Sequence, residues 1–176
     1  MKRIIFVGGI HGVGKTYFCN NLLDNYRLKS YSASELISRV KEQILGSEKS
    51  VQDIMQNQDI LINAVKDLDD TDSYIILDGH FCLLNKDSNV ERVPDKVFNE
   101  LPLVAIIVLN DDVDNIIGRL RERDNVIYPK ALLRRFQEEE LKYSLKVSEQ
   151  LKIPYLSFGN SEDSTKVYKF LDSIIN

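Results

Sequence analysis

The sequence predicts an α/β fold in which a parallel five-stranded sheet is flanked by helices, and three observations lead to that class. Short apolar runs rich in β-branched residues recur between longer segments with helical periodicity. Two of the runs, Tyr74–Leu77 and Leu103–Leu109, are almost continuously apolar, as in strands covered on both faces. The alternation of strand and helix implies parallel strands joined by right-handed crossovers. The five expected strands are Arg3–Val7, Leu28–Ser32, Tyr74–Leu77, Leu103–Leu109 and Tyr155–Phe158.

The segments between these strands read as helices. Asn110–Asp112 offers capping side chains and negative charge at a helix start, and the apolar residues that follow fall on one face. Another helix is expected from about Lys130 to Leu151, with apolar residues spaced for burial and a stop at Pro154. Residues 33–68 hold two helical patterns that break near Gly46.

Length and charge limit the class of protein. The chain has 176 residues, of which 43% are hydrophobic, enough for one domain spanning residues 1–176. The net charge is −4, whereas proteins that wrap nucleic acid carry a basic surplus, so nucleic acid is not expected as a partner. No apolar run approaches the roughly 18 residues of a membrane span, and the N-terminus lacks a signal-peptide pattern, so we expect a cytoplasmic protein. Cys19 and Cys82 lack metal-ligand spacing and are expected in the core.

A glycine-rich loop directly follows the first expected strand. Gly9, Gly14, Lys15 and Thr16 match the pattern G-x-x-x-x-G-K-[ST]. Glycines let the backbone curl so that successive N–H groups face one anion, and the following helix adds its positive N-terminal end. Lys15 then reaches the β- and γ-phosphates, and the Thr16 hydroxyl takes a Mg²⁺ position. The loop predicts a nucleoside triphosphate with Mg²⁺, contacted by Gly9, His11, Gly12, Val13, Gly14, Lys15, Thr16 and Tyr17.

A carboxylate ends the third expected strand. The apolar run Tyr74–Leu77 leads into Asp78, at the strand end where open α/β sheets bind ligands. An acid at this place in a phosphate-loop protein holds the Mg²⁺ shell or takes up a proton. The alternative is structural: Asp78 simply begins the turn that continues at Gly79.

The two histidines of the chain have several possible roles. His11 occupies a variable position of the loop, where its side chain is tolerated at the surface or contacts a phosphate or the acceptor. His80 fits a proton carrier, a contact to the acceptor or a packed ring.

Arginines cluster at the end of the helix that begins near Val113. Arg119 and Arg123 are four residues apart and share a face away from the apolar stripe. Phosphoryl transfer needs positive groups on the migrating charge, and we expect this role for both. Arginines in a last helical turn also complement the helix dipole. Arg134 and Arg135 are spaced to pair with Glu138 and Glu139 on a solvated face.

Three stretches together resemble the P-loop nucleoside monophosphate kinases, in particular their archaeal-type adenylate kinase branch. These stretches are GGIHGVGKT, YIILDGHF and IIGRLRERD. The resemblance implies a three-layer P-loop kinase fold with sheet order 2-3-1-4-5, an acceptor-site insertion over residues 33–68 and a short lid over 119–130. It also implies ATP as the nucleotide, Mg²⁺ at Thr16 and Asp78, and an adenine contact from Asn160 in the loop after the last strand.

The acceptor region departs from that family. Adenylate kinases place arginines there to hold the phosphate of AMP, whereas this chain offers only Arg39 and a few lysines between residues 29 and 71. Several polar side chains in or near the region could bind an uncharged acceptor instead, although each also fits a helix cap or a solvated face. The candidate acceptor residues are Ser34, Arg39, Gln58 and His80.

The sequence thus predicts an ATP- and Mg²⁺-dependent phosphotransferase of the nucleotide-kinase type. Its expected catalytic residues are Lys15, Asp78, Arg119 and Arg123. Two alternatives stay open: a kinase of a nucleoside or another small metabolite, and a slow ATPase that acts as a switch or assembly factor. The oligomeric state is not predicted.

Overall fold

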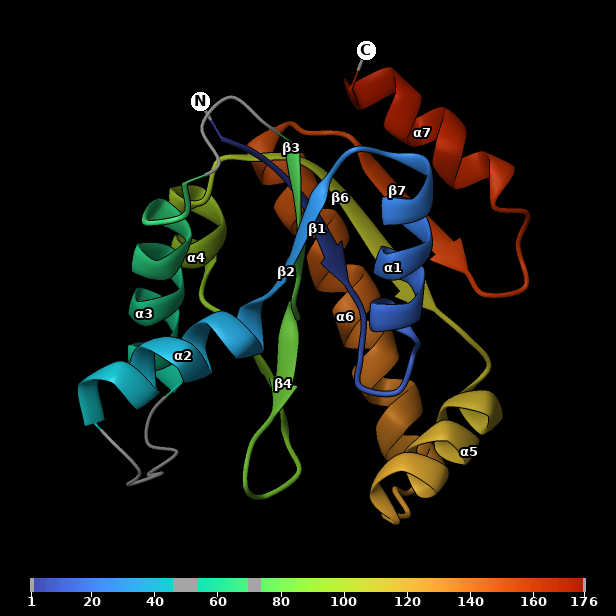
Figure 1. Ribbon diagram of the computed structural model, residues 1–176. Helices are drawn as coiled ribbons and strands as arrows, with labels where there is room; N and C mark the ends of the chain where they lie inside the picture. Colours follow the sequence, from blue (N-terminus) through green and yellow to red (C-terminus); the bar gives the residue numbers. More distant parts are fainter. Residues whose placement is uncertain (1, 46–53, 70–73, 176) are drawn as a thin grey trace.

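The computed structural model describes residues 2–45, 54–69 and 74–175 and contains one parallel sheet with helices on both faces (Figure 1). The sheet strands are β1 (Arg3–Gly8), β2 (Lys29–Ser32), β3 (Tyr74–Asp78), β6 (Leu103–Asn110) and β7 (Tyr155–Gly159). Their order is β2-β3-β1-β6-β7, and every neighbouring pair is parallel. The predicted fold class is confirmed.

The structure also contains a small antiparallel hairpin that the sequence analysis did not predict. It consists of β4 (Cys82–Leu84) and β5 (Val90–Arg92), which follow β3 in the chain and form a separate two-stranded sheet. Because these two strands take the labels β4 and β5, the last two strands of the main sheet are labelled β6 and β7. For this reason the labels differ from the predicted order 2-3-1-4-5. Strands of three residues are too short to show an alternating pattern in the sequence.

Helices cover both faces of the main sheet. In Figure 1, α1 (Lys15–Asn25) lies in front of the sheet and α6 (Lys130–Leu151) behind it. Helix α5 (Val113–Asp124) begins at the predicted cap, where the Asp112 carboxylate accepts a hydrogen bond from the Asp114 N–H at 2.8 Å. Among the described residues, no helix has the length and apolar character needed to cross a membrane. The other helices are α2 (Ala33–Leu45), α3 (Ile54–Lys66), α4 (Asp95–Glu100) and α7 (Thr165–Ile175).

Helices α2 and α3 fall within residues 33–68, the expected acceptor-site insertion. They pack against each other at the side of the sheet where β2 is the edge strand (Figure 1). Gly46, near which the helical pattern was expected to break, lies outside the described residues.

The hydrophobic core surrounds the central strand. Residues Ile4–Val7 of β1 are at most 1% exposed, because β3 and β6 flank β1 and helices cover both faces. Phe81 packs edge-on against Phe6 with ring centroids 4.9 Å apart. Cys19 and Cys82 are buried free thiols, as expected, and burial raises the pKa of both to about 12.

The carboxyl ends of the parallel strands meet at one edge of the sheet. The last residues of β2, β3 and β1 are Ser32, Asp78 and Gly8. Because β1 is central, the glycine-rich loop that follows it lies in the middle of this edge. Open α/β sheets bind ligands there, so the topology directs the search for a site to this edge.

Candidate active site

The loop between β1 and α1 adopts the curled backbone that the glycine pattern requires. Gly12 has a φ of 80° and Gly14 a φ of 102°, a region that residues with a Cβ rarely enter. At Gly12 a Cβ would also lie 2.7 Å from the Leu120 side chain, so helix α5 packs directly against the loop. Helix α1 then begins at Lys15, with its N-terminal N–H groups turned toward the loop.

Lys15 is held at the floor of the site. Its side chain is 9% exposed, and its Nζ donates a hydrogen bond to the Gly9 carbonyl at 2.8 Å. The same Nζ lies 3.9 Å from Asp78 Oδ1. Burial lowers the pKa of Lys15, while the nearby carboxylates of Asp78 and Glu140 oppose the shift. The ammonium group is therefore poorly hydrated, a state that favours contact with an anion.

Asp78 and Thr16 bring two oxygen ligands to the same pocket. Asp78 ends β3 with its side chain 16% exposed; burial raises its pKa, and Lys15 opposes the rise. No group of three His, Cys, Asp or Glu side chains able to hold a metal occurs in the described part of the chain. Mg²⁺ in kinase sites is commonly bound by one or two protein oxygens together with substrate phosphates and water. The donor set of Thr16 and Asp78 fits that arrangement.

A pocket of about 750 Å³ opens beside the loop, a volume within the range of small-molecule sites. It brings together residues from the loop, the ends of β2 and β3, the hairpin and helix α5. Its lining residues are His11, Gly12, Gly14, Lys15, Thr16, Tyr17, Ser32, Ser34, Asp78, Gly79, His80, Leu83, Arg119, Glu122 and Arg123.

Five of the candidate residues from the sequence do not line this pocket. Gly9 and Val13 are buried behind the loop surface, and Asn160 contacts the loop from another side. Arg39 lies on an exposed face of α2, whereas Gln58 is 8% exposed on α3 and faces the core.

The two histidines pack against each other. The rings of His11 and His80 have centroids 4.3 Å apart. Burial, Lys15 and Arg123 lower the pKa of His11 to about 4, and burial with Lys15 holds the pKa of His80 well below its usual value. Both rings are therefore neutral near pH 7. Within the described residues, His80 Nδ1 is buried without a hydrogen-bond partner.

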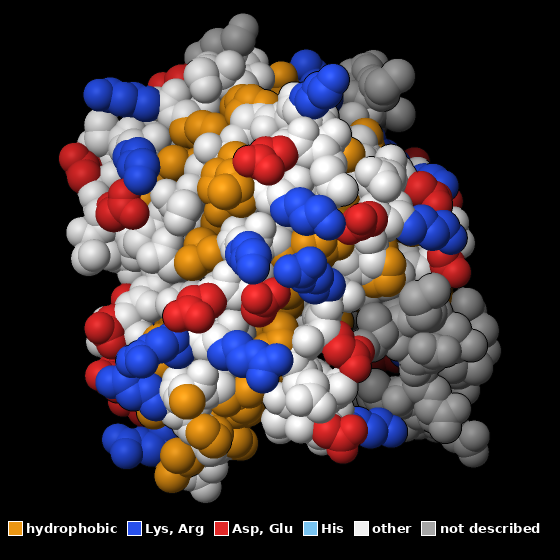
Figure 2. All heavy atoms as spheres, turned by 180° about the vertical axis from the view of Figure 1, so that it is seen from behind, with side chains coloured by type: hydrophobic (Ala, Val, Ile, Leu, Met, Phe, Trp, Pro, Cys, Tyr) orange, Lys and Arg blue, Asp and Glu red, His pale blue; other side chains and the backbone are white. Residues whose placement is uncertain are grey.

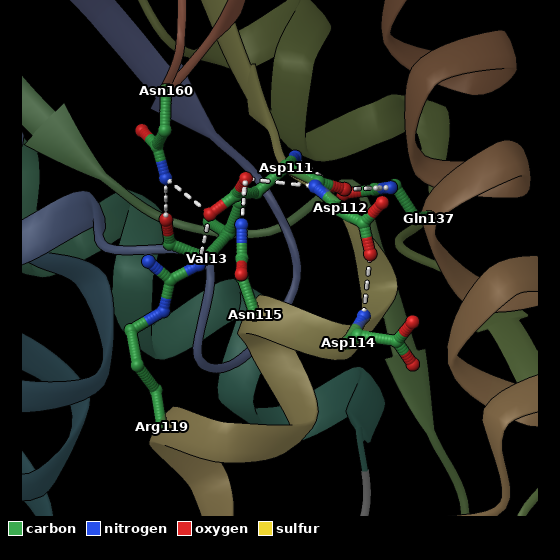
Figure 3. Close-up of polar contacts among 8 residues, drawn as sticks. All are labelled: Val13, Asp111, Asp112, Asp114, Asn115, Arg119, Gln137 and Asn160. Carbon is green, nitrogen blue, oxygen red and sulfur yellow. Dashed lines mark hydrogen bonds and ion pairs between the residues drawn. The ribbon is translucent and has the colours of Figure 1, made fainter.

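A polar network centred on Asp111 joins the loop to its surroundings (Figure 3). The Asp111 carboxylate forms an ion pair with Arg119 and accepts a hydrogen bond from Asn160 Nδ2 at 3.0 Å. The same Nδ2 donates to the Val13 carbonyl at 2.7 Å. Burial alone would raise the pKa of Asp111, but these hydrogen bonds and one from Asn115 lower it to about 2. Arg119 is thus anchored beside the loop.

Arg123 has a different environment. Its guanidinium pairs with the neighbouring Asp124 at 2.6 Å and is 61% exposed, and it lines the pocket. Arg134 and Arg135 are exposed on α6, and Glu139 forms its ion pair with Arg92 at 3.1 Å. The arginines of α5 are therefore the ones that the structure brings to the pocket.

Glu140 is a residue of the site that the sequence analysis missed. It lies on α6, is 1% exposed, and accepts backbone hydrogen bonds from Gly9 at 2.9 Å and Cys82 at 2.6 Å. The Phe81 N–H donates to the same carboxylate at 3.0 Å. Burial raises the pKa of Glu140 to about 7, and the N–H donors and Lys15 oppose the rise. The available signal was a charged residue within the apolar stripe of α6.

Comparisons with known proteins agree with the fold. The sequence profile of a family described as AAA domain matches residues 8–128, more than half of the chain. A gluconokinase from Sinorhizobium meliloti 1021 is similar in structure, at 13% identity and a TM-score of 0.53, over 94% of this chain and 86% of that chain. A Chloroflexus aurantiacus j-10-fl protein described as a kinase is similar at 14% identity and a TM-score of 0.59, over 99% of both chains. No curated protein sequence matches significantly. At these identities the likeness concerns the fold.

Proposed function

The chain belongs to the AAA domain family, and we propose that it acts as an ATP- and Mg²⁺-dependent phosphotransferase with a small-molecule acceptor. The observation that carries the proposal is the pairing of Lys15 with Asp78 at 3.9 Å, at the floor of a pocket that extends from the curled loop to the ends of β2 and β3. A phosphate-binding cation beside a carboxylate is suited to hold a nucleotide with Mg²⁺ for phosphoryl transfer, and the part of the pocket at the ends of β2 and β3 leaves room for a second substrate.

The loop holds the nucleotide in this proposal. Backbone N–H groups of Gly12 and Gly14 face the phosphates together with the N-terminal end of α1. Lys15 exchanges its hydrogen bond with the Gly9 carbonyl for contacts to the β- and γ-phosphates. Thr16 and Asp78 are the residues that would hold Mg²⁺, which when bound neutralises charge on the β- and γ-phosphate oxygens.

The remaining residues position groups and exclude water. Arg123 stabilises charge on the transferring phosphoryl group, while Arg119, held by Asp111, borders the nucleotide. Asn160, which fixes the Val13 carbonyl, lies where we propose that the nucleobase binds. Catalysis then comes from positioning and electrostatic stabilisation, with little covalent chemistry from the protein.

The more detailed part of the proposal concerns the identity of the acceptor and the segments that border it or move. A nucleoside monophosphate is the acceptor that the resemblance to adenylate kinases implies. The same resemblance implies that residues 1–176 form one kinase domain. Helices α2 and α3 would then border the acceptor, and residues 119–130 would act as a short lid. One alternative is a kinase whose acceptor is a nucleoside or another small metabolite, and the other is a slow ATPase that acts as a switch or assembly factor.

The first experiment measures ADP release from Mg·ATP with a panel of nucleoside monophosphates, nucleosides and small metabolites. We expect one acceptor to accelerate turnover about a thousandfold, equivalent to roughly 4 kcal/mol of barrier. The Lys15→Ala variant should lose both nucleotide binding and this acceleration. Unchanged ATP binding or turnover in Lys15→Ala would refute the proposal, and slow Lys15-dependent hydrolysis with no responding acceptor would favour the switch.

A further inference from the structure

The end of the pocket opposite α5 is built from hydroxyl groups, one carboxylate and a neutral ring. Ser32 and Ser34 contribute hydroxyls 2.9 Å apart, from the end of β2 and the start of α2. Asp78 and His80 come from the end of β3 and the turn after it, and Leu83 adds an apolar wall from β4. We call these five residues the acceptor end.

The charge of the acceptor end is negative. Asp78 is the charged residue of the five, and Lys15 of the phosphate loop lies 3.9 Å from its Oδ1. The cations that line the pocket are Lys15 in the phosphate loop and the arginines of α5.

The basic residues of α2 and α3 that the structure describes do not change this balance. Arg39 lies on an exposed face of α2, Lys41 is half-buried on the same helix, and Lys66 of α3 pairs with Glu100 at 3.4 Å. None of the three lines the pocket. Among the described lining residues, β2, α2, β3 and β4 therefore contribute no cation. A phosphate or carboxylate on the acceptor would lie beside Asp78 with no cation from these elements to bind it, which is costly in a partly desolvated site.

The same groups suit an uncharged, hydroxylated molecule. Serine hydroxyls both donate and accept hydrogen bonds, so adjacent Ser32 and Ser34 can bind a hydroxyl of either orientation. His80 Nδ1, buried and without a partner in the described part of the chain, is a polar atom that ligand binding could satisfy. Leu83 would cover the carbon skeleton.

We propose that the phosphoryl acceptor is a hydroxyl group of a small molecule without negative charge, bound between Ser32, Ser34 and Leu83. This inference rests on the proposed phosphotransferase function. The acceptor oxygen forms a bond to the γ-phosphorus, and the bond from that phosphorus to the β,γ-bridging oxygen breaks. ADP leaves with the bonding electron pair, and the hydroxyl proton is released to water.

The test separates possible acceptors by charge. A protein-free small-molecule extract of cells is divided on an anion-exchange resin into an unretained fraction, without anions, and a retained anionic fraction. Each fraction is incubated with the full chain and Mg·ATP labelled at the γ-phosphate, and labelled products other than inorganic phosphate are separated. We expect a labelled phosphate ester from the unretained fraction, at least about tenfold above the retained one.

The outcomes distinguish the two proposals. A labelled ester formed only from the retained fraction would overturn the uncharged acceptor and leave the phosphotransferase intact. No ester from either fraction, with ATP binding still dependent on Lys15, would overturn both and leave the ATPase.

A matched pair of variants then tests the position of the acceptor. With the acceptor isolated from the unretained fraction, Ser34→Ala should raise the acceptor KM about five- to tenfold and leave the KM for ATP unchanged. Ser38→Ala is the control, since Ser38 is exposed on the same helix and does not line the pocket. An unchanged acceptor KM in both Ser32→Ala and Ser34→Ala would place the acceptor elsewhere.

Discussion

At the scale of single residues, Glu140 ties together two segments far apart in the sequence. Its carboxylate accepts hydrogen bonds from Gly9 at the start of the phosphate loop and from Phe81 and Cys82 after the strand that ends in Asp78. We infer that Glu140 is a positioning residue, because it fixes the two segments that carry Lys15 and Asp78.

Replacing Glu140 with Gln keeps the size of the side chain but turns an amide NH₂ toward N–H donors. We expect the free energy of unfolding to fall by on the order of 2 kcal/mol, since buried donors lose their acceptor. The KM for ATP should rise as well, because the loop loses its support. Urea unfolding and steady-state kinetics measure the two effects. The exposed Glu138→Gln on the same helix is the control and should change neither.

The pKa of Glu140 gives the free energy of unfolding a defined pH dependence. Burial raises this pKa from 4.5 to about 7. Between these values the folded protein holds a proton that the unfolded chain has released, so the stabilisation is complete below pH 4.5 and is lost as the pH rises through 7. Relative to Glu140→Gln, the wild type should lose at most about 3 kcal/mol across this window. Parallel pH dependences of the two proteins in urea titrations would contradict this.

The sequence predicts some of these residues and misses others for a physical reason. Lys15, Thr16 and Asp78 follow from local spacing, because a loop after a strand and a carboxylate at a strand end lie at the same sheet edge. Glu140 and Asp111 act through contacts with residues far away in the chain, Gly9 and Asn160 among them. Such contacts depend on which helix face turns toward the loop, and spacing alone does not give them.

At the scale of elements, helix α5 presents two arginines with different anchoring. Arg119 is bound to Asp111 within the polar network of Figure 3, whereas Arg123 pairs only with the exposed Asp124 among the described residues. The two side chains were predicted to act together on the phosphoryl group. Their environments instead favour a supporting role beside the loop for Arg119 and a mobile charge at the pocket for Arg123.

Replacing the arginines one at a time separates these roles. We expect Arg123→Ala to lower kcat about 10²-fold without changing the free energy of unfolding, because it removes charge stabilisation from the transition state. Arg119→Ala should chiefly raise the KM for ATP. Arg121→Ala is the control, since Arg121 is exposed on the same helix and does not line the pocket. Equal effects of all three replacements on kcat would contradict the assignment.

The sequence predicts a helix or strand reliably where its hydrophobic pattern extends over many residues. Helix α6 runs over Lys130–Leu151 as expected, because its apolar stripe repeats over many turns. The hairpin and the short helix α4 (Asp95–Glu100) gave too few residues for a pattern. At a single position such as Gln58, polarity suggested a site, whereas the structure buries this residue on α3 and does not place it at the pocket.

At the scale of the whole molecule, the parallel sheet gathers the site from segments spread along the chain. The phosphate loop, the acceptor end and the arginines of α5 meet at one edge because the strands before them run in the same direction (Figure 1). In the view from behind, the basic side chains of the described residues are interspersed with acidic ones (Figure 2).

The connection between α5 and α6 exposes apolar side chains to solvent. Ile127 is 75% exposed and Val126 41% exposed, although both are apolar. Because Arg123 precedes them and lines the pocket, a nucleotide that binds Arg123 should draw the connection inward and cover these side chains. The expected lid therefore has apolar surface to bury when it closes.

Limited trypsin digestion can detect this closure. Trypsin cleaves after arginine, and Arg121 and Arg123 lie in the exposed last turn of α5. A Mg²⁺ complex of a non-hydrolysable ATP analogue, at about 100 times its Kd, should slow cleavage there at least about tenfold, because the bound state is populated at the expense of the open one. Lys15→Ala should show no protection, since it lacks the phosphate contact that starts the closure. Equal cleavage of the wild type with and without the analogue would mean that the connection between α5 and α6 stays open when the nucleotide binds.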